Sequence, residues 1–323
     1  RDGPGARAHL PSLAWRTART ALERGPVLIQ VPRRGYLPAL SCQSCRAPVH
    51  CLRCKGPVAV AAQGAAAACR WCGTLMGADG FVCPHCEGRA LRSTVVGAGR
   101  TAEELGRAFA GVPVHTSGGE AVLGRVSAAP GLVIATPGAE PVAEGGYAAV
   151  LLLDAWALLD RPSLDAGSEA LRRWMAAAAL ARTRADGGVV VLAGAPGQVT
   201  LAPVEALVRW DPGWLAEREL AERRELRLPP AVTMAQVVGS RHTLAEVLAC
   251  AELPGGAERF GPLPRSAGPG RHDQQGLLQV LLRVEPAERA ALAAALAHVR
   301  AVRSARKETD PLTIRLDPAD PVA

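Results

Sequence analysis

Short apolar runs alternate with helix-forming stretches over the first two thirds of the chain. Strands are expected at residues 27–31, near 93–96, and at 112–115, 132–136, 150–154 and 189–193, and helices at 12–24, 101–109 and 168–184. Strands that are apolar throughout and alternate with helices are typical of a sheet covered on both faces. The pattern therefore predicts a doubly wound parallel α/β sheet, interrupted after its first strand by a cysteine-rich insertion.

A different order of elements follows from about residue 211. A charged helix at residues 214–226 leads to an expected series of strand 232–239, helix 243–252, strands 258–262 and 277–284, helix 286–302 and strand 312–316. This βαββαβ order is that of a ferredoxin-like domain. The loop between its middle strands, residues 261–276, is rich in glycine and proline, and we expect it to be exposed and mobile.

Composition changes this picture little. The chain has 323 residues, a formal charge of +7 and a pI near 9.2, which mildly favours a nucleic-acid partner. No apolar run approaches the roughly 20 residues that span a bilayer. We therefore expect a cytoplasmic, nucleoid-associated protein that has no membrane partner.

Eight cysteines form four Cys-x-x-Cys pairs within residues 42–86. Two intervening residues let both sulfurs of a pair reach one metal ion, and two pairs complete a tetrahedral all-cysteine zinc site. The spacing therefore predicts two structural zinc ions as cofactors. The pairs are Cys42/Cys45, Cys51/Cys54, Cys69/Cys72 and Cys83/Cys86.

The pairing of these motifs is a separate question. Sequential pairing would close across only five residues, whereas nested pairing joins Cys51/Cys54 to Cys69/Cys72 across fourteen, a span typical of a zinc ribbon. We favour nested pairing, with Cys42/Cys45 and Cys83/Cys86 closing around the outside. A disulfide framework is the alternative, but a long chain without a secretory signal favours metal. His50 and His85 are expected to be bystanders, and the ninth cysteine, Cys250, a small core residue.

Two basic segments are candidates for DNA contacts. Arg33, Arg34 and Tyr36 follow the first strand at its carboxyl end, where open α/β sheets bind ligands, although a solvated turn explains them equally well. Arg265 and Arg271 lie in the loop of the C-terminal domain.

Charge does not by itself make the cysteine region a DNA-binding surface. Residues 33–89 carry seven Arg/Lys and two acids, a formal +5, and two four-thiolate zinc centres would remove about four charges. A docking surface for protein partners is therefore an equal alternative. The arginines that end the last helix, among them Arg300 and Arg303, are expected chiefly to complement the helix dipole.

Several catalytic classes lack their residues in this chain. It has no Gly-x-x-x-x-Gly-Lys-Ser/Thr loop, and neither Lys55 nor Lys307 is placed to serve one. Residues 97–102 fit Gly-x-Gly-x-x-Ala, but a tight strand-to-helix turn explains these glycines better than a dinucleotide site does. No acid/base pair or Ser-His-Asp set stands out. The sequence thus names no catalytic residue.

Longer stretches resemble one known family, the bacterial primosomal replication-restart proteins PriA. The resemblance covers nearly the whole chain from about residue 12 and is most specific in the Arg-Arg-Gly-Tyr segment and the four cysteine pairs. The similar stretches are VLIQVPRRGYLPALSCQSC at 27–45, GAGRTAEELGRAF at 97–109, LLLDA at 151–155, LAERELAERRELRLPP at 215–230 and TIRLDPADP at 313–321.

The resemblance implies a domain order. Residues 1–39 would begin a RecA-like lobe, the second helicase lobe; residues 40–91 would be its double-zinc insertion, again with nested pairing; residues 92–210 would complete the lobe; and residues 211–323 would form the C-terminal domain. The DNA-binding domains and the first helicase lobe of the family would lie upstream. It also implies recognition of branched or single-stranded DNA at abandoned forks, and as partners a single-stranded-DNA-binding protein and the replicative helicase or its loader.

The chain departs from the family where ATP is contacted. Active members carry Gln-x-x-Gly-Arg-x-Gly-Arg, and the corresponding residues 178–184 read Ala-Ala-Leu-Ala-Arg-Thr-Arg. The fifth helicase motif is also eroded, at residues 135–140. We therefore assign no ATP-contacting role to Arg182 or Arg184, and we predict a restart factor without helicase activity. The alternatives are an ATP-driven 3′–5′ helicase whose P-loop lobe lies outside this chain, and a zinc-ribbon adaptor for proteins only.

Overall fold

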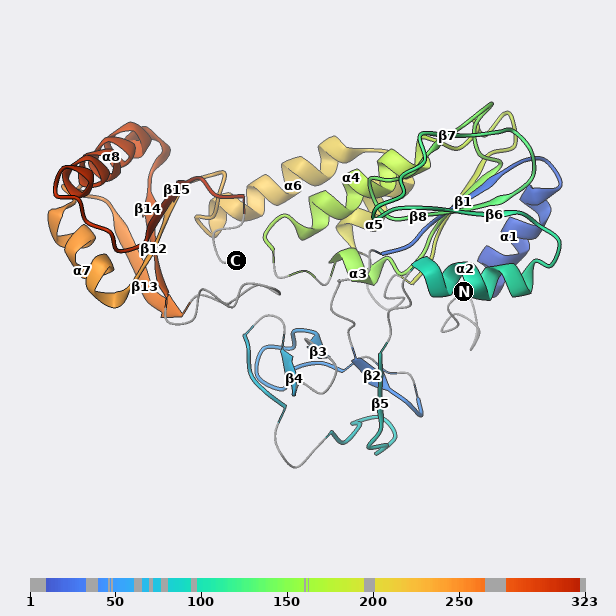
Figure 1. Ribbon diagram of the computed structural model, residues 1–323, viewed down its shortest axis with the longest axis horizontal. Helices are drawn as coiled ribbons and strands as arrows, with labels where there is room; N and C mark the ends of the chain where they lie inside the picture. Colours follow the sequence, from blue (N-terminus) through green and yellow to red (C-terminus); the bar gives the residue numbers. More distant parts are fainter. Residues whose placement is uncertain are drawn as a thin grey trace. The chain divides into compact units, whose positions relative to one another are not determined.

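A computed structural model describes residues 10–32, 40–45, 47, 49–60, 66–69, 72–76, 81–93, 98–159, 161, 163–194, 201–264 and 277–319 (Figure 1). The chain divides into two compact units. The first comprises Arg1–Pro162 and Ala166–Pro212, and the second comprises Ser163–Asp165 and Gly213–Ala323. None of the helices in the described ranges is long and apolar enough to cross a membrane.

The first unit is built on a five-stranded parallel sheet. Its strand order is β11-β10-β1-β8-β6, with β1 (Val27–Gln30) in the centre. The other strands are β6 (Val114–Ser117), β8 (Leu132–Ala135), β10 (Ala149–Leu152) and β11 (Val189–Leu192). All four residues of β1, β8 and β10 are buried, which is why these strands are apolar except at Gln30. The predicted parallel sheet is confirmed.

Helices cover both faces of this sheet. On one face, α1 (Ser12–Leu22) and α2 (Ala98–Ala108) share a core with alternate strand residues such as Ile29 and Ile134. On the other face, the amide of Gln30 reaches the backbone of α4 (Ala166–Ala178) at Arg173. The sheet is therefore doubly wound, as its sequence pattern predicts.

Some predicted boundaries are wrong. The helix expected at residues 168–184 ends at Ala178, because the next turn leaves the helix to bond Tyr147: its N–H donates to Leu180 O at 3.0 Å and its carbonyl accepts from Arg182 N at 2.9 Å. Of the strand expected near residues 93–96, only Ser93 is described, at the end of β5 (Leu91–Ser93), which pairs antiparallel outside the parallel sheet; residues 94–97 lie outside the described ranges, so that strand stays a prediction. The expected strand 112–115 lies two residues later.

The sequence pattern did not predict four short elements, because each is too short to show a clear repeat of apolar residues. They are the helices α3 (Trp156–Leu159) and α5 (Ala202–Arg209), and the strands β7 (Arg125–Val126) and β9 (Val142–Ala143), which pair with each other.

The second unit contains an antiparallel sheet with the order β13-β14-β12-β15. Helices α7 and α8 share one hydrophobic core with its strands, so both cover the same face. This is the predicted ferredoxin-like arrangement, and it is confirmed. The elements are α6 (Pro212–Glu225), β12 (Thr233–Gly239), α7 (Arg241–Cys250), β13 (Glu258–Pro264), β14 (Leu278–Val284), the 3-10 turn η3 (Pro286–Glu288), α8 (Arg289–Ala305) and β15 (Leu312–Leu316).

Two predictions for this unit need comment. Cys250 is exposed at the end of α7, so the expectation of a core residue is wrong: the apolar face of this helix is formed by residues such as Leu244 and Val247. The loop that carries Arg265 and Arg271 lies within residues 265–276, outside the described ranges.

Candidate metal centre

The described part of the cysteine region contains two short antiparallel strand pairs. Strand β2 (Leu40–Cys42) pairs with β5 where the region begins and ends, and β3 (Val58–Val60) pairs with β4 (Ala67–Cys69) inside it (Figure 1). Among its described residues, the apolar core is a small hydrophobic cluster that includes Leu40, Val49 and Val58. A core of this size supplies little stability, so the region needs another source of it.

All four Cys-x-x-Cys pairs adopt the same tight turn. In each, the backbone N–H of the first cysteine donates to the carbonyl five residues later, at 2.8–3.0 Å. The residue after the second cysteine is left-handed wherever it is described, even though two of the three are not glycine (Lys55, φ 62°; Glu87, φ 58°; Gly73, φ 69°). The turn points both sulfurs of a pair toward one place. Its four carbonyl acceptors belong to Ala47, Gly56, Thr74 and Gly88.

The turns bring the eight sulfurs into two groups of four. The outer cluster contains Cys42, Cys45, Cys83 and Cys86, and the inner cluster contains Cys51, Cys54, Cys69 and Cys72; within each, all sulfurs lie within 4.8 Å of one another. This is the nested grouping.

The spacing within each cluster suits a metal ion. Close Sγ–Sγ distances are 3.5 Å in the outer cluster (Cys42–Cys86, Cys45–Cys83) and 3.3–3.7 Å in the inner one (Cys54–Cys69, Cys54–Cys72, Cys51–Cys72). A tetrahedron with Zn–S bonds of about 2.3 Å has edges of about 3.8 Å, whereas a disulfide bond is about 2.05 Å long. The residues therefore fit two four-coordinate sites, and no disulfide links these cysteines.

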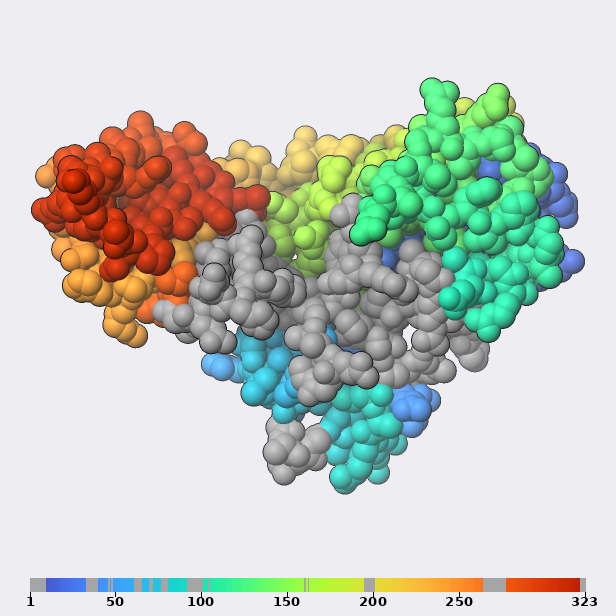
Figure 2. Space-filling view, viewed as in Figure 1, coloured from blue at the N-terminus to red at the C-terminus, as the bar shows by residue number. Residues whose placement is uncertain are grey.

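Burial is alike in the two clusters. The first cysteine of every pair is buried, the second cysteines Cys45 and Cys54 are half-buried, and Cys72 and Cys86 are exposed. Neither His50 nor His85 belongs to a cluster; the His50 ring instead lies 3.1 Å from the carbonyl of Lys55. The described cysteine region contributes to the molecular surface, in light blue to cyan in Figure 2.

Without a metal ion, the thiols of a cluster have opposing pKa shifts. The backbone N–H of Cys45 is the main cause that lowers the pKa of Cys42 to about 6. At Cys86 of the same cluster the N–H of Gly88 also acts to lower the pKa, but the sulfurs of Cys45 and Cys42, together with burial, raise it to about 12. A divalent cation would remove this opposition, because it stabilises four thiolates at once.

One glycine shapes the outer cluster. A Cβ atom on Gly88 would lie 3.3 Å from the sulfurs of both Cys42 and Cys86 and 3.0 Å from the hydroxyl of Ser44. The site therefore needs a residue without a side chain here. The sequence shows this glycine two residues after a Cys-x-x-Cys pair, but the spacing of the cysteines alone does not reveal why a glycine is required there.

The DNA-contact candidates lie outside the described residues. This applies to Arg33, Arg34 and Tyr36 after β1 and to Arg265 and Arg271 in the C-terminal loop, so their role stays a prediction.

The arginine that aligns with an ATP-contacting position has internal partners. Arg182 donates from Nε to the carbonyls of Gly145 and Gly146, both at 3.2 Å, and from Nη1 to the carbonyl of Arg24 at 3.0 Å. These loops precede β10 and β1, so the guanidinium joins the amino ends of the two strands, opposite the carboxyl edge at which open α/β sheets bind ligands. Arg184 is exposed.

Arg303 of α8 is likewise structural. It is buried, with 8% of its surface exposed, and it pairs with Glu246 and Glu308 while donating to the carbonyl of Asp310 at 3.1 Å. Such a guanidinium cannot bind a phosphate without losing these partners.

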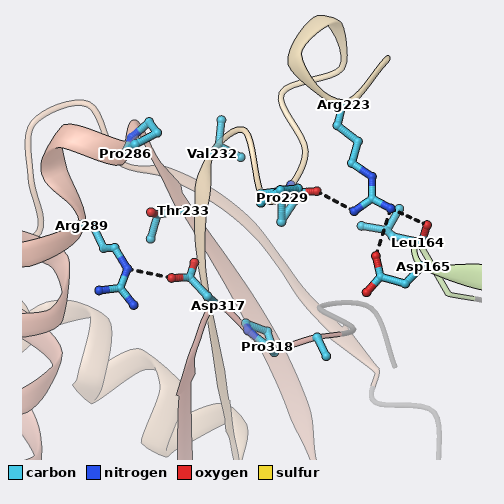
Figure 3. A pocket seen from close by; sticks show the side chains of 12 residues that line it. Leu164, Asp165, Arg223, Pro229, Val232, Thr233, Pro286, Arg289, Asp317 and Pro318 are labelled. Carbon is cyan, nitrogen blue, oxygen red and sulfur yellow. Dashed lines mark hydrogen bonds and ion pairs between the residues drawn. The ribbon is translucent and has the colours of Figure 1, made fainter. Parts of the chain in front are cut away.

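A hollow in the second unit is lined by twelve residues, four of which are prolines (Figure 3). Arg223 crosses one side and donates to the carbonyls of Pro229 and Leu164 and to the carboxylate of Asp165, at 2.9–3.0 Å. On the other side Arg289 donates to Asp317 at 2.8 Å. Arg223 thus fixes the segment that leads into the ferredoxin-like sheet, because its guanidinium bonds three groups of that segment and its neighbours. These contacts indicate a structural role and not a ligand site.

Comparison with known proteins adds the family. Residues 224–319 match the family described as primosomal protein N C-terminal domain. The probable replication restart protein PriA of Mycobacterium leprae is 47% identical over 323 residues, covering 98% of this chain and 49% of the relative. Those of Mycobacterium bovis and Mycobacterium tuberculosis are each 44% identical over 331 residues, covering 98% of this chain and 50% of the relative. The chain spans about half the length of the curated relatives that it matches, and it belongs to the family of replication restart proteins PriA.

Proposed function

We propose that this chain is part of a replication restart factor that binds branched DNA at abandoned forks and helps to reload the replicative helicase, without unwinding DNA by ATP hydrolysis of its own. The observation that carries the proposal is the 43–47% identity, over 98% of the chain, to proteins named for replication restart. The partners would be fork DNA, a single-stranded-DNA-binding protein and the replicative helicase or its loader, in the cytoplasm at the nucleoid.

We further propose zinc as the metal of both cysteine clusters. Four thiolates at tetrahedral spacing are the donor set that structural zinc prefers. Cys42, Cys45, Cys83 and Cys86 would hold one ion and Cys51, Cys54, Cys69 and Cys72 the other. Each ion would supply folding free energy to a region with a small core.

The contacts of Arg182 support the absence of helicase turnover. Its guanidinium is bonded to three backbone carbonyls of its own unit, and residues 178–181 lack the glutamine and glycine of the active pattern. Measurement of ATP hydrolysis with and without DNA, using this chain joined to the remaining half that its relatives carry, tests this point. Hydrolysis stimulated by DNA would favour the helicase alternative.

Fork recognition is tested by binding of the same joined protein to a three-way fork and to plain duplex of equal length, over a series of salt concentrations. We expect tighter binding to the fork. If Arg33 and Arg34 contact phosphates, each replacement by alanine reduces the salt slope by about 1, whereas the control Arg184→Ala leaves it unchanged. Equal affinity for fork and duplex would contradict the proposal, and protein-partner binding without any DNA affinity would favour the adaptor.

A further inference from the structure

One difference between the two metal clusters lies at the carbonyl-acceptor position of the cysteine turns. Three of the four cysteine turns have alanine or glycine at the carbonyl-acceptor position, and the turn after Cys72 has Thr74. The Thr74 hydroxyl lies 3.1 Å from the exposed sulfur of Cys72. A second sulfur, that of the half-buried Cys54, lies 3.3 Å from Cys72. An accessible sulfur, a hydroxyl and a second sulfur therefore meet at the inner cluster.

The outer cluster also has an exposed sulfur, that of Cys86, which interacts with the half-buried Cys45. What it lacks is a threonine at the carbonyl-acceptor position beside that exposed sulfur. The position that corresponds to Thr74 is Gly88, which has no hydroxyl. The two sites thus present unequal chemistry to a small reagent from solvent.

We propose that Cys72 and Cys54 form a peroxide-reactive modification site, which oxidises to a disulfide and thereby opens the inner metal site while the outer one persists. The inference rests on the proposed metal sites and goes beyond them. Its reagent is hydrogen peroxide, a two-electron oxidant small enough to reach an exposed sulfur.

The reaction has two balanced steps. The Cys72 sulfur attacks one oxygen of the peroxide: an S–O bond forms, the O–O bond breaks, and the departing hydroxide takes a proton to become water. The Thr74 hydroxyl, next to that sulfur, is placed to donate a hydrogen bond to the departing oxygen. The Cys54 sulfur then attacks Cys72: an S–S bond forms, the S–O bond breaks, and a second hydroxide takes a proton.

Overall, two thiolates lose two electrons and one peroxide becomes two waters. The sulfurs must approach from 3.3 Å to about 2.05 Å, a shift of about 1.3 Å that the exposed turn can accommodate. Only Cys51 and Cys69 then remain as thiolates of the inner cluster, too few for a four-coordinate site.

The test uses the whole zinc-loaded chain with Cys250→Ser, which removes the exposed thiol that lies outside both clusters. Zinc is counted before oxidation, hydrogen peroxide is added, and release is followed with a chromogenic chelator while peptide mapping locates disulfides. We expect one zinc per chain to leave well before the other, together with a Cys54–Cys72 disulfide. Loss of one hydrogen bond in Thr74→Val should slow the early release about fivefold.

Ser44→Ala is the matched control, since it removes a hydroxyl beside the outer cluster, and it should leave the early release unchanged. Three results would overturn this inference while the metal assignment stands. They are two zincs at the start that are released at one rate, a disulfide within the outer cluster, and an unchanged release rate in Thr74→Val. Absence of zinc before any oxidant is added would overturn the metal assignment instead.

Discussion

Replacement of Arg182 by alanine tests whether this arginine stabilises the sheet or serves a nucleotide. The side chain bonds three carbonyls that precede β1 and β10, at 3.0–3.2 Å. Glycine is needed beside it, because a Cβ atom on Gly25 would lie 2.5 Å from its Nη2. Truncation would leave those carbonyls without their donor and would leave a gap where the stem packs on Gly146.

The magnitude follows from the contacts. Nε is shared between two carbonyls, so the side chain supplies about two effective hydrogen bonds, worth about 1 kcal/mol each at a half-exposed position. The stem, partly buried against Gly146, adds about 1 kcal/mol of packing. The expected loss is about 3 kcal/mol, which for a unit of this size lowers its unfolding temperature by about 6–12 °C.

The assay is thermal unfolding of the whole chain, with backbone hydrogen exchange to assign the change to the first unit. Arg184→Ala, two residues away and exposed, is the matched control and should shift the unfolding temperature by less than about 2 °C. An unchanged unfolding temperature in Arg182→Ala would refute the structural role. Loss of ATP binding in that variant, with stability intact, would show that the arginine serves a nucleotide after all.

Three further predictions concern the metal clusters and α4. Cys51→Ser should lower the zinc content from two ions to one per chain, as measured by elemental analysis. Hydrogen exchange should show that the inner hairpin unfolds while the parallel sheet stays folded. Loss of both ions would contradict two separate sites. Gly88→Val should release the outer zinc, whereas Gly124→Val, where nothing lies within 4 Å of the new Cβ atom, should retain both ions. Hydrogen bonding from Arg172 is the main cause that lowers the pKa of Glu169 from 4.5 to about 2. A lowered carboxyl pKa stabilises the folded state above about pH 4.5, and this stabilisation is lost as the pH falls toward 2. Glu169→Gln should therefore make the free energy of unfolding depend less on pH in this range. An acid-unfolding curve identical to that of the unchanged protein would contradict this.

The parallel sheet could be predicted from sequence because its central strands are buried on both faces and therefore apolar at every position, as Val27–Gln30 nearly is. Helix ends were harder. Residues 179–184 continue an alanine-rich stretch with high helical propensity, and only the long-range bonds to Tyr147 take them out of the helix. Helical propensity depends on neighbouring residues and therefore cannot report hydrogen bonds to a distant residue such as Tyr147.

The spacing favoured the nested cysteine grouping over the sequential one, because the fourteen residues between Cys54 and Cys69 are a span typical of a zinc ribbon. The parts played by Gly88 and Thr74 could not be predicted in the same way, since they depend on which side chain faces which sulfur. Cys250 shows the opposite failure: its residue type is usually buried, but its place on α7 faces solvent. The DNA contacts proposed at Arg33 and Arg265 stay predictions.

The carboxyl edge of the parallel sheet gives a second physical reason to expect no nucleotide turnover. There Glu140 accepts hydrogen bonds from the amide of Gln30 at 2.6 Å and from the backbone N–H of Gly138 at 2.8 Å. A backbone N–H and a side-chain amide are donors that could otherwise face a phosphate, and here a carboxylate of the chain itself occupies them. Its negative charge repels a triphosphate, and displacing it would leave the buried amide of Gln30 without its closest acceptor. Among the described residues, Glu140 thus occupies two donors at the carboxyl edge and Arg182 bonds three carbonyls at the amino edge, and both sets of contacts support the proposal that this sheet does not turn over ATP.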